Sequence, residues 1–451
     1  MSFKTVAPRL KERMLPFFGM SLLGVMLAAL SVSIPAIQII GLLVVVLLAL
    51  VIFALPELGL VITSLGGRFN RVPFLETIDG PVYVAALSLS LTVFVMIMRR
   101  RFHALLSRAY LFACLLFLAV LAAGVMYSVS PSYGTTKLIE FAFYTLPLLV
   151  LALSMVTSRQ HYVNFFLGLA VITFGLALLG IAGGVLSGGL ANGRISALGG
   201  GPNVFGRFMV IGALSTLFLI NCIKVRGFAV CGYIALAIYA IAAFYSGSRQ
   251  AFIGFILALV MYGLLIWLKS SNKKRSRFLL TLGIVGALLV SIFTVIPVEK
   301  ITGGTAWIRL TLLFQEDKGT SVDARFVFAE AAWYLFQQRW FTGWGTGSFA
   351  RMYSEEIRYP HNIFLEVMCE LGAIGLAAFL IVLAVAAFAT VRLMISKKKS
   401  ELSGMDVSLI ATVITCFFFS LYAAQISGDL YDNRWVWLFG ALLAGLPHAL
   451  K

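Results

Sequence analysis

Two arginines in glycine- and serine-rich turns are the first residues here that could do chemistry. Arg249 ends the run at 246–249 (SGSR), between two strongly apolar stretches, and Arg194 precedes the run at 199–203 (GGGPN). An arginine near membrane depth is costly and is usually paired or functional. Guanidinium forks beside exposed backbone N–H groups predict phosphate sites, with Arg207 as a further candidate one turn later. The alternatives are a snorkelling Arg249 and a structural turn at Arg194.

His361 is the candidate for proton transfer. It stands in the run Pro-His-Asn, directly before an apolar stretch. The remaining three histidines lie in basic loops or at the C-terminal end: His103, His161 and His448. A histidine titrates near neutral pH and can act as a general base. The alternative is that His361 and Asn362 only cap the following helix.

Acidic and basic side chains recur near these turns. Glu366 and Glu370 follow His361 on one apolar stretch, as partners inside a bundle or as surface charges. A second cluster could bind sugar hydroxyls or form a structural ion pair, and it contains Asp429, Asp432 and Arg434. Two further basic residues belong to the same set of loops: Lys137 and Arg325. Arginines for a diphosphate, one histidine and these carboxylates predict a lipid-linked anionic sugar as substrate.

Composition excludes other classes of ligand. The net charge of +17 lies in short loops between apolar stretches, as the positive-inside rule requires, so we expect no nucleic-acid partner. The five cysteines show no CxxC spacing. We therefore predict neither a metal site nor a disulfide framework, and no cofactor.

The elements that must position these residues are membrane helices. The chain is 61% hydrophobic and 12% charged, which predicts an all-α polytopic membrane protein. Four basic loops sort to one side, predicted to be cytoplasmic: 99–108, 224–226, 269–277 and 392–399. The spans predicted between these loops include 228–245, 250–268 and 278–296. If the basic N-terminal segment is also cytoplasmic, the apolar stretch at 15–66 must contain an odd number of spans before residue 81, for a total of about 12 and at most about 14.

The opposite side receives the polar loops that contain the candidate residues. They are 128–137, 188–203, 245–249, 298–361 and 428–434. The long loop 298–361 carries an amphipathic helix at 322–338, rich in aromatic residues, and a flexible glycine-rich return at 343–347. We expect residues 1–451 to form a single membrane domain that includes this loop.

The sequence resembles the O-antigen ligase and O-antigen polymerase (Wzy-type) superfamily of membrane glycosyltransferases. The resemblance rests on the order of its motifs over roughly residues 120–450. It is carried by Asp323-x-Arg325, the glycine return, the run from His361-Asn362 to Glu370-Leu371-Gly372, the Arg249 turn, and Gly201-Pro202-Asn203 with Arg194 upstream.

The resemblance implies a fold of the membrane glycosyltransferase C type with a large periplasmic loop. It implies an undecaprenyl-diphosphate-linked glycan donor and metal-independent transfer at the periplasmic face of the bacterial inner membrane. Arg194 and Arg249 would hold the diphosphate, and His361 would activate the acceptor hydroxyl. The other candidates would support substrate binding: Lys137, Arg207, Arg325, Asn362, Glu366, Asp429, Asp432 and Arg434.

The superfamily contains two activities. A polymerase adds glycan to another lipid-linked repeat and can work with a chain-length regulator protein, whereas a ligase passes glycan to lipid A core. The run at 428–434 (GDLYDNR) is more similar to polymerases, which favours O-antigen polymerase in lipopolysaccharide biosynthesis. A transporter of the same lipid-linked sugar is a further alternative, although transport gives no evident reason for one histidine at the outer end of a span.

Overall fold

The structure is a computed structural model with a contact pattern of two units, Met1–Ala54 and Leu55–Lys451. It describes residues 46–65, 80–99, 107–186, 194–198, 201–225, 227–269, 320–354, 357–396 and 402–450. Residues 46–54 of the first unit are helical. All further description concerns the second unit, which contains every candidate residue.

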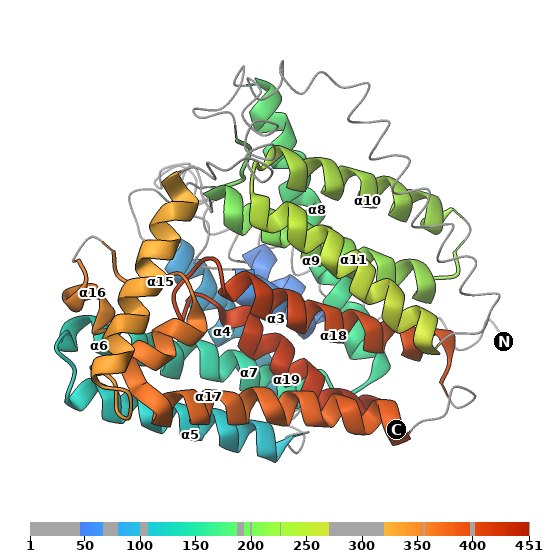
Figure 1. Cartoon of the computed structure of the whole chain (residues 1–451). Helices are drawn as coiled ribbons and strands as arrows, with labels where there is room; N and C mark the ends of the chain where they lie inside the picture. Colours follow the sequence, from blue (N-terminus) through green and yellow to red (C-terminus); the bar gives the residue numbers. More distant parts are fainter. Residues whose placement is uncertain are drawn as a thin grey trace, which may run out of the picture. The chain divides into compact units, whose positions relative to one another are not determined.

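The second unit is built from helices in its described part (Figure 1). In chain order they are α3 (Pro56–Leu65), α4 (Gly80–Met98), α5 (Arg108–Met126), α6 (Pro131–Glu140), the π-helix η2 (Phe141–Thr145), α7 (Leu146–Met155), α8 (Arg159–Leu186), α9 (Gly201–Cys222), α10 (Phe228–Tyr245), α11 (Arg249–Lys269), α15 (Thr320–Gln338), α16 (Phe349–Met352), α17 (Ile363–Ser396), α18 (Gly404–Ala424) and α19 (Arg434–Ala449). Eight helices in these ranges are long and apolar enough to cross a membrane. The chain is a polytopic membrane protein, and the total of about 12 spans stays a prediction.

The predicted spans agree closely with these helices where the structure describes them. The stretch predicted at 228–245 is α10 (Phe228–Tyr245), and the one at 250–268 is α11. Most of the stretch at 15–66, the span at 278–296 and the loop part at 298–319 lie outside the described residues. Hydropathy suffices for these spans because a lipid-exposed backbone must be helical.

The predicted loop 128–137 is wrong in its second half. Helix α6 begins at Pro131, so Lys137 lies on its second turn and not in a loop. Proline is well suited to the first turn of a helix, because its missing N–H would lack a partner there in any case. The charge of Lys137 hid the helix from a hydropathy reading, and buried carboxylates offset that charge, as described below.

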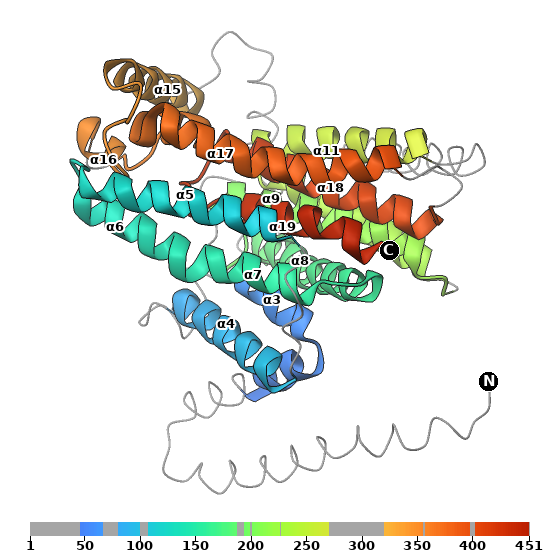
Figure 2. The same ribbon diagram turned by 90° about the horizontal axis from the view of Figure 1, so that it is seen from below.

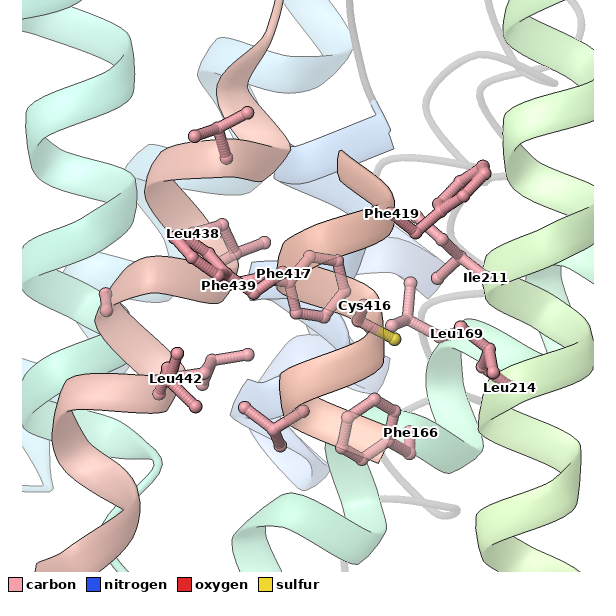
Figure 3. Close-up of a cluster of buried hydrophobic side chains, with 14 of the residues drawn as sticks. Phe166, Leu169, Ile211, Leu214, Cys416, Phe417, Phe419, Leu438, Phe439 and Leu442 are labelled. Atoms are coloured by element: carbon pink, nitrogen blue, oxygen red, sulfur yellow. The ribbon is translucent and has the colours of Figure 1, made fainter. Parts of the chain in front are cut away.

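The core packs α8, α9, α18 and α19 against one another. Figure 3 shows interlocking side chains from these four helices. They include Phe166, Leu169, Ile211, Leu214, Cys416, Phe417, Phe419, Leu438, Phe439 and Leu442. The core residues on α18 and α19 are fully buried or nearly so, and so are Asp429 and Leu430 in the loop between these helices.

Helix α15 has an apolar inner face and an apolar outer face. On the inner side, Phe328, Ala332 and Leu335 pack with Phe349 of α16 and Cys369 of α17. Both views place α15 and α16 at the end of the bundle where α17 begins (Figures 1 and 2). On the outer side, Phe326, Trp333 and Tyr334 are exposed, as is Trp340 just beyond the helix. The helix predicted at 322–338 is therefore present, as α15, but it is apolar on two sides and does not divide into one apolar and one polar face.

The glycine-rich return at 343–347 is not a flexible segment. Gly343, Gly345 and Gly347 all have positive φ, which only glycine adopts without strain. The N–H groups of Trp344 and Gly345 donate to carbonyls of Cys369 and Glu370, at 3.1 and 2.8 Å. The return is thus a bonded strap on α17.

A kink in α17 makes this contact possible. Gly372 has φ 63 and ψ −157, a non-helical conformation inside the helix. The break leaves backbone groups of α17 without partners inside the helix, and the strap bonds to the carbonyls among them. The N–H of Ala373 donates to the carbonyl of Trp340, just before the strap, at 2.8 Å. The strap and the kink together fix the first part of α17, which carries Glu366 and Glu370.

Candidate functional site

The two arginines predicted to bind diphosphate meet at one turn. Arg194 Nε donates to the carbonyl of Ser246 at 2.9 Å, and its Nη2 donates to Asn203 Oδ1 at 3.1 Å. Gly247, at φ 59, lies directly against the Arg194 side chain, where a Cβ would approach Cγ to 3.2 Å. Arg249 begins α11 two residues later and is half-buried. The structure therefore places the Arg194 side chain against the turn that ends in Arg249.

Arg207 links this turn to the end of α18. It lies on α9, whose Gly206 packs against Ser246 and Ser248 of the turn. Arg207 Nη2 donates to the carbonyls of Ala423 and Ser427, at 3.0 and 2.6 Å, and Nη1 donates to Asn433 Oδ1 at 3.2 Å. These contacts hold the guanidinium at the loop between α18 and α19.

His361 sits beside this cationic region, directly before α17. Asn362 caps that helix, because its Oδ1 accepts from the N–H groups of Phe364 and Leu365 at 3.0 and 3.1 Å. His361 itself adopts φ 60, which is uncommon for a non-glycine residue and often marks a functional position. Asn362 alone thus provides the side-chain cap of α17, and the His361 ring packs against aromatic side chains instead.

The His361 ring is enclosed by aromatic side chains. Tyr359 packs edge-on at 4.6 Å and Phe328 of α15 lies at 6.0 Å between ring centroids. Within the described part of the chain, the buried Nδ1 has no hydrogen-bond partner. A buried nitrogen without a partner is rare and calls for an explanation such as a catalytic role.

Electrostatics keep His361 neutral. Burial, the nearby Arg325 of α15 and then Arg207 lower the pKa of His361 from 6.5 to about 4, although Asp429 acts in the opposite direction. The imidazole is therefore unprotonated at neutral pH and can accept a proton. Two arginines beside a neutral histidine form an arrangement that can hold an anion next to a base.

A buried charge cluster centred on Lys137 supports the same region. Lys137 Nζ lies 2.6 Å from Glu366 Oε1, 2.7 Å from Glu370 Oε1 and 3.4 Å from Asp429 Oδ1. All four side chains are at most 2% exposed. Burial on this scale is tolerated only when charges are paired and hydrogen-bonded. Glu366 and Glu370 are thus partners inside the bundle rather than surface charges.

The cluster joins three separate parts of the fold. Glu366 Oε1 also accepts from the N–H of Leu430 at 3.1 Å, which ties α17 to the loop between α18 and α19. Glu370 Oε2 accepts from the N–H of Gly347 at 2.8 Å, which ties α17 to the strap. Lys137 therefore anchors α6, the strap and the loop beside His361.

The acidic and basic run at 428–434 is divided between different partners. Asp429 faces Lys137, whereas Arg434 Nη2 donates to Glu140 Oε2 at 2.8 Å and stacks 3.9 Å above the Tyr144 ring. Asp432 is half-buried and lines a small cavity with Arg207. The three charged residues of the run therefore do not form one shared binding cluster.

Sequence reasoning missed Tyr133 and Glu140. Tyr133 Oη donates to Asp429 Oδ2, and Lys137 Nζ lies 5.1 Å from the Tyr133 ring. The signal was present, because Tyr133 and Lys137 are four residues apart and share a face of a helix once α6 is recognised. Glu140 lacked such a signal, because its partner Arg434 lies far away in the sequence.

The described ranges contain no group of three or more His, Cys, Asp or Glu side chains placed to hold a metal ion. The prediction of metal-independent chemistry stays a prediction. The buried acids instead face Lys137, whose ammonium occupies the position between them.

Comparison with known families assigns one segment of the chain. The O-antigen ligase family model matches residues 234–380. Residues 234–380 are an O-antigen ligase family domain. The domain covers α11 with Arg249, α15 with Arg325, the strap, His361 and the kinked start of α17. No curated protein matches the chain.

The O-antigen ligase family domain gives the coarse function. The family comprises membrane enzymes of glycosyltransferase type, of the O-antigen ligase and polymerase kind, that act on lipid-linked glycans. The resemblance drawn from the motif order is thereby confirmed. Arg194, Arg207, Lys137 and Asp429 lie outside the matched range, yet they contact or influence residues within it.

Proposed function

We propose that this chain is a polymerase of lipid-linked oligosaccharide repeat units. In this proposal it transfers glycan from undecaprenyl diphosphate to a sugar hydroxyl of an acceptor at the periplasmic face of the inner membrane. The observation that carries the proposal is the buried Nδ1 of His361, which has no hydrogen-bond partner among the described residues and belongs to an imidazole kept neutral by burial, Arg325 and Arg207. A transferase needs a base and an anion site next to one another, and this region supplies both.

The donor diphosphate is assigned to Arg194 and Arg249. Both arginines meet at the turn 246–249, and Arg207 connects this turn to the surroundings of His361. A groove of about 170 Å³ between α11 and α18 starts near Gly254, roughly one turn beyond Arg249. Its lining is almost entirely apolar, with Leu257 and Phe418 exposed along it, which suits the prenyl chain.

The chemical step balances without a metal. The acceptor hydroxyl oxygen attacks the anomeric carbon of the donor sugar, and its proton passes to a ring nitrogen of His361. The bond from the anomeric carbon to the diphosphate oxygen breaks, and undecaprenyl diphosphate leaves with the electron pair. The arginines stabilise the negative charge of the leaving group. His361 then returns its proton to water, and its neighbouring arginines favour that release.

Donor binding strengthens the base. A histidine with a pKa of about 4 is a weak base in the free enzyme. A diphosphate bound at Arg194 and Arg249 adds negative charge to the region next to Arg207, so the pKa of His361 rises towards the working pH. The base thus becomes effective only when a donor is present.

O-antigen ligase is the second candidate, favoured by the description of the matching family. The two reactions share a donor and differ in the acceptor. The choice of polymerase rests on the similarity of the run at 428–434 to polymerases, and a membrane glycosyltransferase fold of the C type forms part of the proposal.

A reconstituted assay separates the candidate functions. Purified protein in vesicles receives a lipid-linked donor, with either a second lipid-linked repeat or lipid A core as acceptor. A ladder of lengthened glycans on the lipid carrier, unchanged by EDTA, is the expected result. Product only on lipid A core would instead establish a ligase. Movement of donor across the bilayer without any product would establish a transporter.

A further inference from the structure

A polar groove opens beside Tyr133, at the start of α6. Its volume is about 490 Å³, which is within the range of small-molecule sites. The side chains that line it come from the first turns of α6, from α16 and from the segment before His361. They are Ser130, Pro131, Ser132, Tyr133, Thr136, Ala350, Arg351 and Arg358.

The chemistry of this lining matches an anionic saccharide. Arg351 and Arg358 are exposed, and a guanidinium can bind a carboxylate or phosphate through two parallel hydrogen bonds. Ser130, Ser132 and Thr136 offer hydroxyl groups for sugar hydroxyls. Among the described residues that line the groove, none is acidic.

Existing contacts place the two arginines at the groove. Arg358 lies over the Tyr133 ring, with 5.6 Å from its guanidinium carbon to the ring centroid. Arg351 Nη1 donates to the carbonyl of Val129 at 3.3 Å, a long bond that leaves its other donors available to a ligand. The Tyr133 ring also lines the groove and provides an apolar surface for the C–H face of a sugar.

We propose that this groove binds an acidic sugar of the acceptor glycan, one that carries a carboxylate or phosphate group. This inference rests on the proposed transferase function and adds the chemical class of its acceptor. The diphosphate arginines lie at the turn before α11, whereas both views show α6 and α16 apart from α9 and α11 (Figures 1 and 2). The groove is therefore a subsite separate from the donor diphosphate.

The groove is connected to the proposed base. Arg358 is three residues before His361, and Tyr359 between them packs on the His361 ring. Tyr133 lines the groove and donates to Asp429, one of the groups that influence His361. A sugar held in the groove would thus place a neighbouring hydroxyl of the same glycan towards His361.

The test compares acceptors that differ only in charge. Wild type and the double variant Arg351→Gln, Arg358→Gln receive an acceptor oligosaccharide with a uronic acid, one with a phosphate ester, and a carboxyl-reduced neutral one. We expect the double variant to raise KM for at least one acidic acceptor about tenfold, the effect of losing one or two charge-assisted hydrogen bonds. Its KM for the neutral acceptor and for the donor should be unchanged. Equal KM values for wild type and double variant with both acidic acceptors would overturn the proposal.

A binding measurement keeps this test independent of catalysis. Saturation-transfer NMR with the free acidic oligosaccharides and purified protein should show contact in wild type and much weaker contact in the double variant. Arg392→Gln, an exposed arginine at the far end of α17, is the matched control and should behave as wild type. If wild type binds neither acidic oligosaccharide, or if phosphatidylglycerol vesicles displace them, the groove is not a saccharide site. Absence of product from wild type with every acceptor, while binding is intact, would refute the transferase function alone.

Discussion

The pKa of His361 depends on groups that act in opposite directions, and their balance sets the pH range in which the imidazole can accept a proton. Burial, then Arg325 on α15 and Arg207 on α9, lower its pKa, while Asp429 from the loop between α18 and α19 raises it. Since neutral His361 is the active form, activity should fall as pH drops through its pKa. A donor diphosphate at Arg194 and Arg249 adds negative charge to this region, stabilises the protonated imidazole and raises that pKa.

The pH profile tests this coupling. The acidic limb of kcat/KM for the donor reports the free enzyme and should lie near pH 4. The acidic limb of the kcat profile reports the enzyme–substrate complex and should lie at higher pH than the limb of kcat/KM. Arg325→Gln removes a positive charge and should move the kcat/KM limb upwards. Steady-state rates from about pH 3 to 8 in buffers of constant ionic strength check both shifts. A kcat/KM limb near pH 6.5 in wild type, unmoved in the variant, would contradict this account.

Lys137 should contribute to the stability of the fold more than to the chemical step. Lys137→Met leaves Glu366, Glu370 and Asp429 buried without a cation. Removing one partner of a buried pair costs about 3–5 kcal/mol. Arg159→Met is the matched control, because Arg159 is 40% exposed in its pair with Asp406 and its loss should cost about 1 kcal/mol or less. Thermal unfolding in detergent measures both, and equal effects would show that the Lys137 cluster is not stabilising.

At the residue scale, sequence reasoning identified charged groups but not their partners. Arg194, Arg249 and His361 stood out because arginine and histidine are unusual beside apolar stretches. Pairings such as Lys137 with Glu366, or Arg434 with Glu140, join positions more than 200 residues apart. No local pattern encodes such a pair, so Glu140 became visible only in the structure.

At the scale of elements, the kink in α17 is the feature that aligns the site. Gly372 adopts a conformation open only to glycine, and a Cβ there would clash with the backbone of Phe341 and Gly343. The strap fits because α17 bends at this residue. Glu370, two residues before the kink, holds the strap through its side chain as well as its carbonyl.

Gly372→Ala should therefore destabilise the protein and reduce transfer. The strained backbone and the clash with main-chain atoms predict a loss of at least about 2 kcal/mol. Gly175→Ala on α8 is the control, because a Cβ there meets nothing within 4 Å and should be neutral or slightly stabilising. Thermal unfolding combined with the transfer assay decides the matter. Wild-type stability in Gly372→Ala would mean that the kink is not required.

The elements themselves were largely predictable where the structure describes them. Apolar runs located α10 and α11 within a residue at each end, since twenty apolar residues leave few alternatives to a spanning helix. The strap was expected to be flexible because it is rich in glycine. The positive φ of Gly343, Gly345 and Gly347 shows that these glycines serve a fixed, bonded conformation instead.

At the scale of the whole second unit, the candidate site and the basic residues lie at opposite ends of α11 and α17. The site gathers where α10 and α18 end and where α11 and α17 begin. The other ends of α11 and α17 carry Lys269 and Arg392, from two of the predicted cytoplasmic loops. The loop residues 270–277 and 397–399 lie outside the described residues. The orientation in the membrane and the single domain over 1–451 stay predictions.

Cysteine labelling tests the orientation. In a variant without the five native cysteines, Thr135→Cys on α6 should react with a membrane-impermeant thiol reagent in intact spheroplasts. Arg392→Cys should react only after the membrane is opened. Thr135 and Arg392 are both exposed, so a difference in reactivity reports sidedness rather than burial. The reverse pattern would place the site on the cytoplasmic side and refute the periplasmic assignment.

The most direct test of the account is the role of His361 in transfer. Wild type, His361→Ala and the control His448→Ala, an exposed histidine near the C-terminus, are compared with lipid-linked donor and acceptor in the reconstituted assay. Donor binding is measured in parallel. The account predicts that His361→Ala folds and binds donor as wild type does, yet forms no product, while His448→Ala is fully active. Robust product from His361→Ala would contradict it and would leave the arginines as the only catalytic groups.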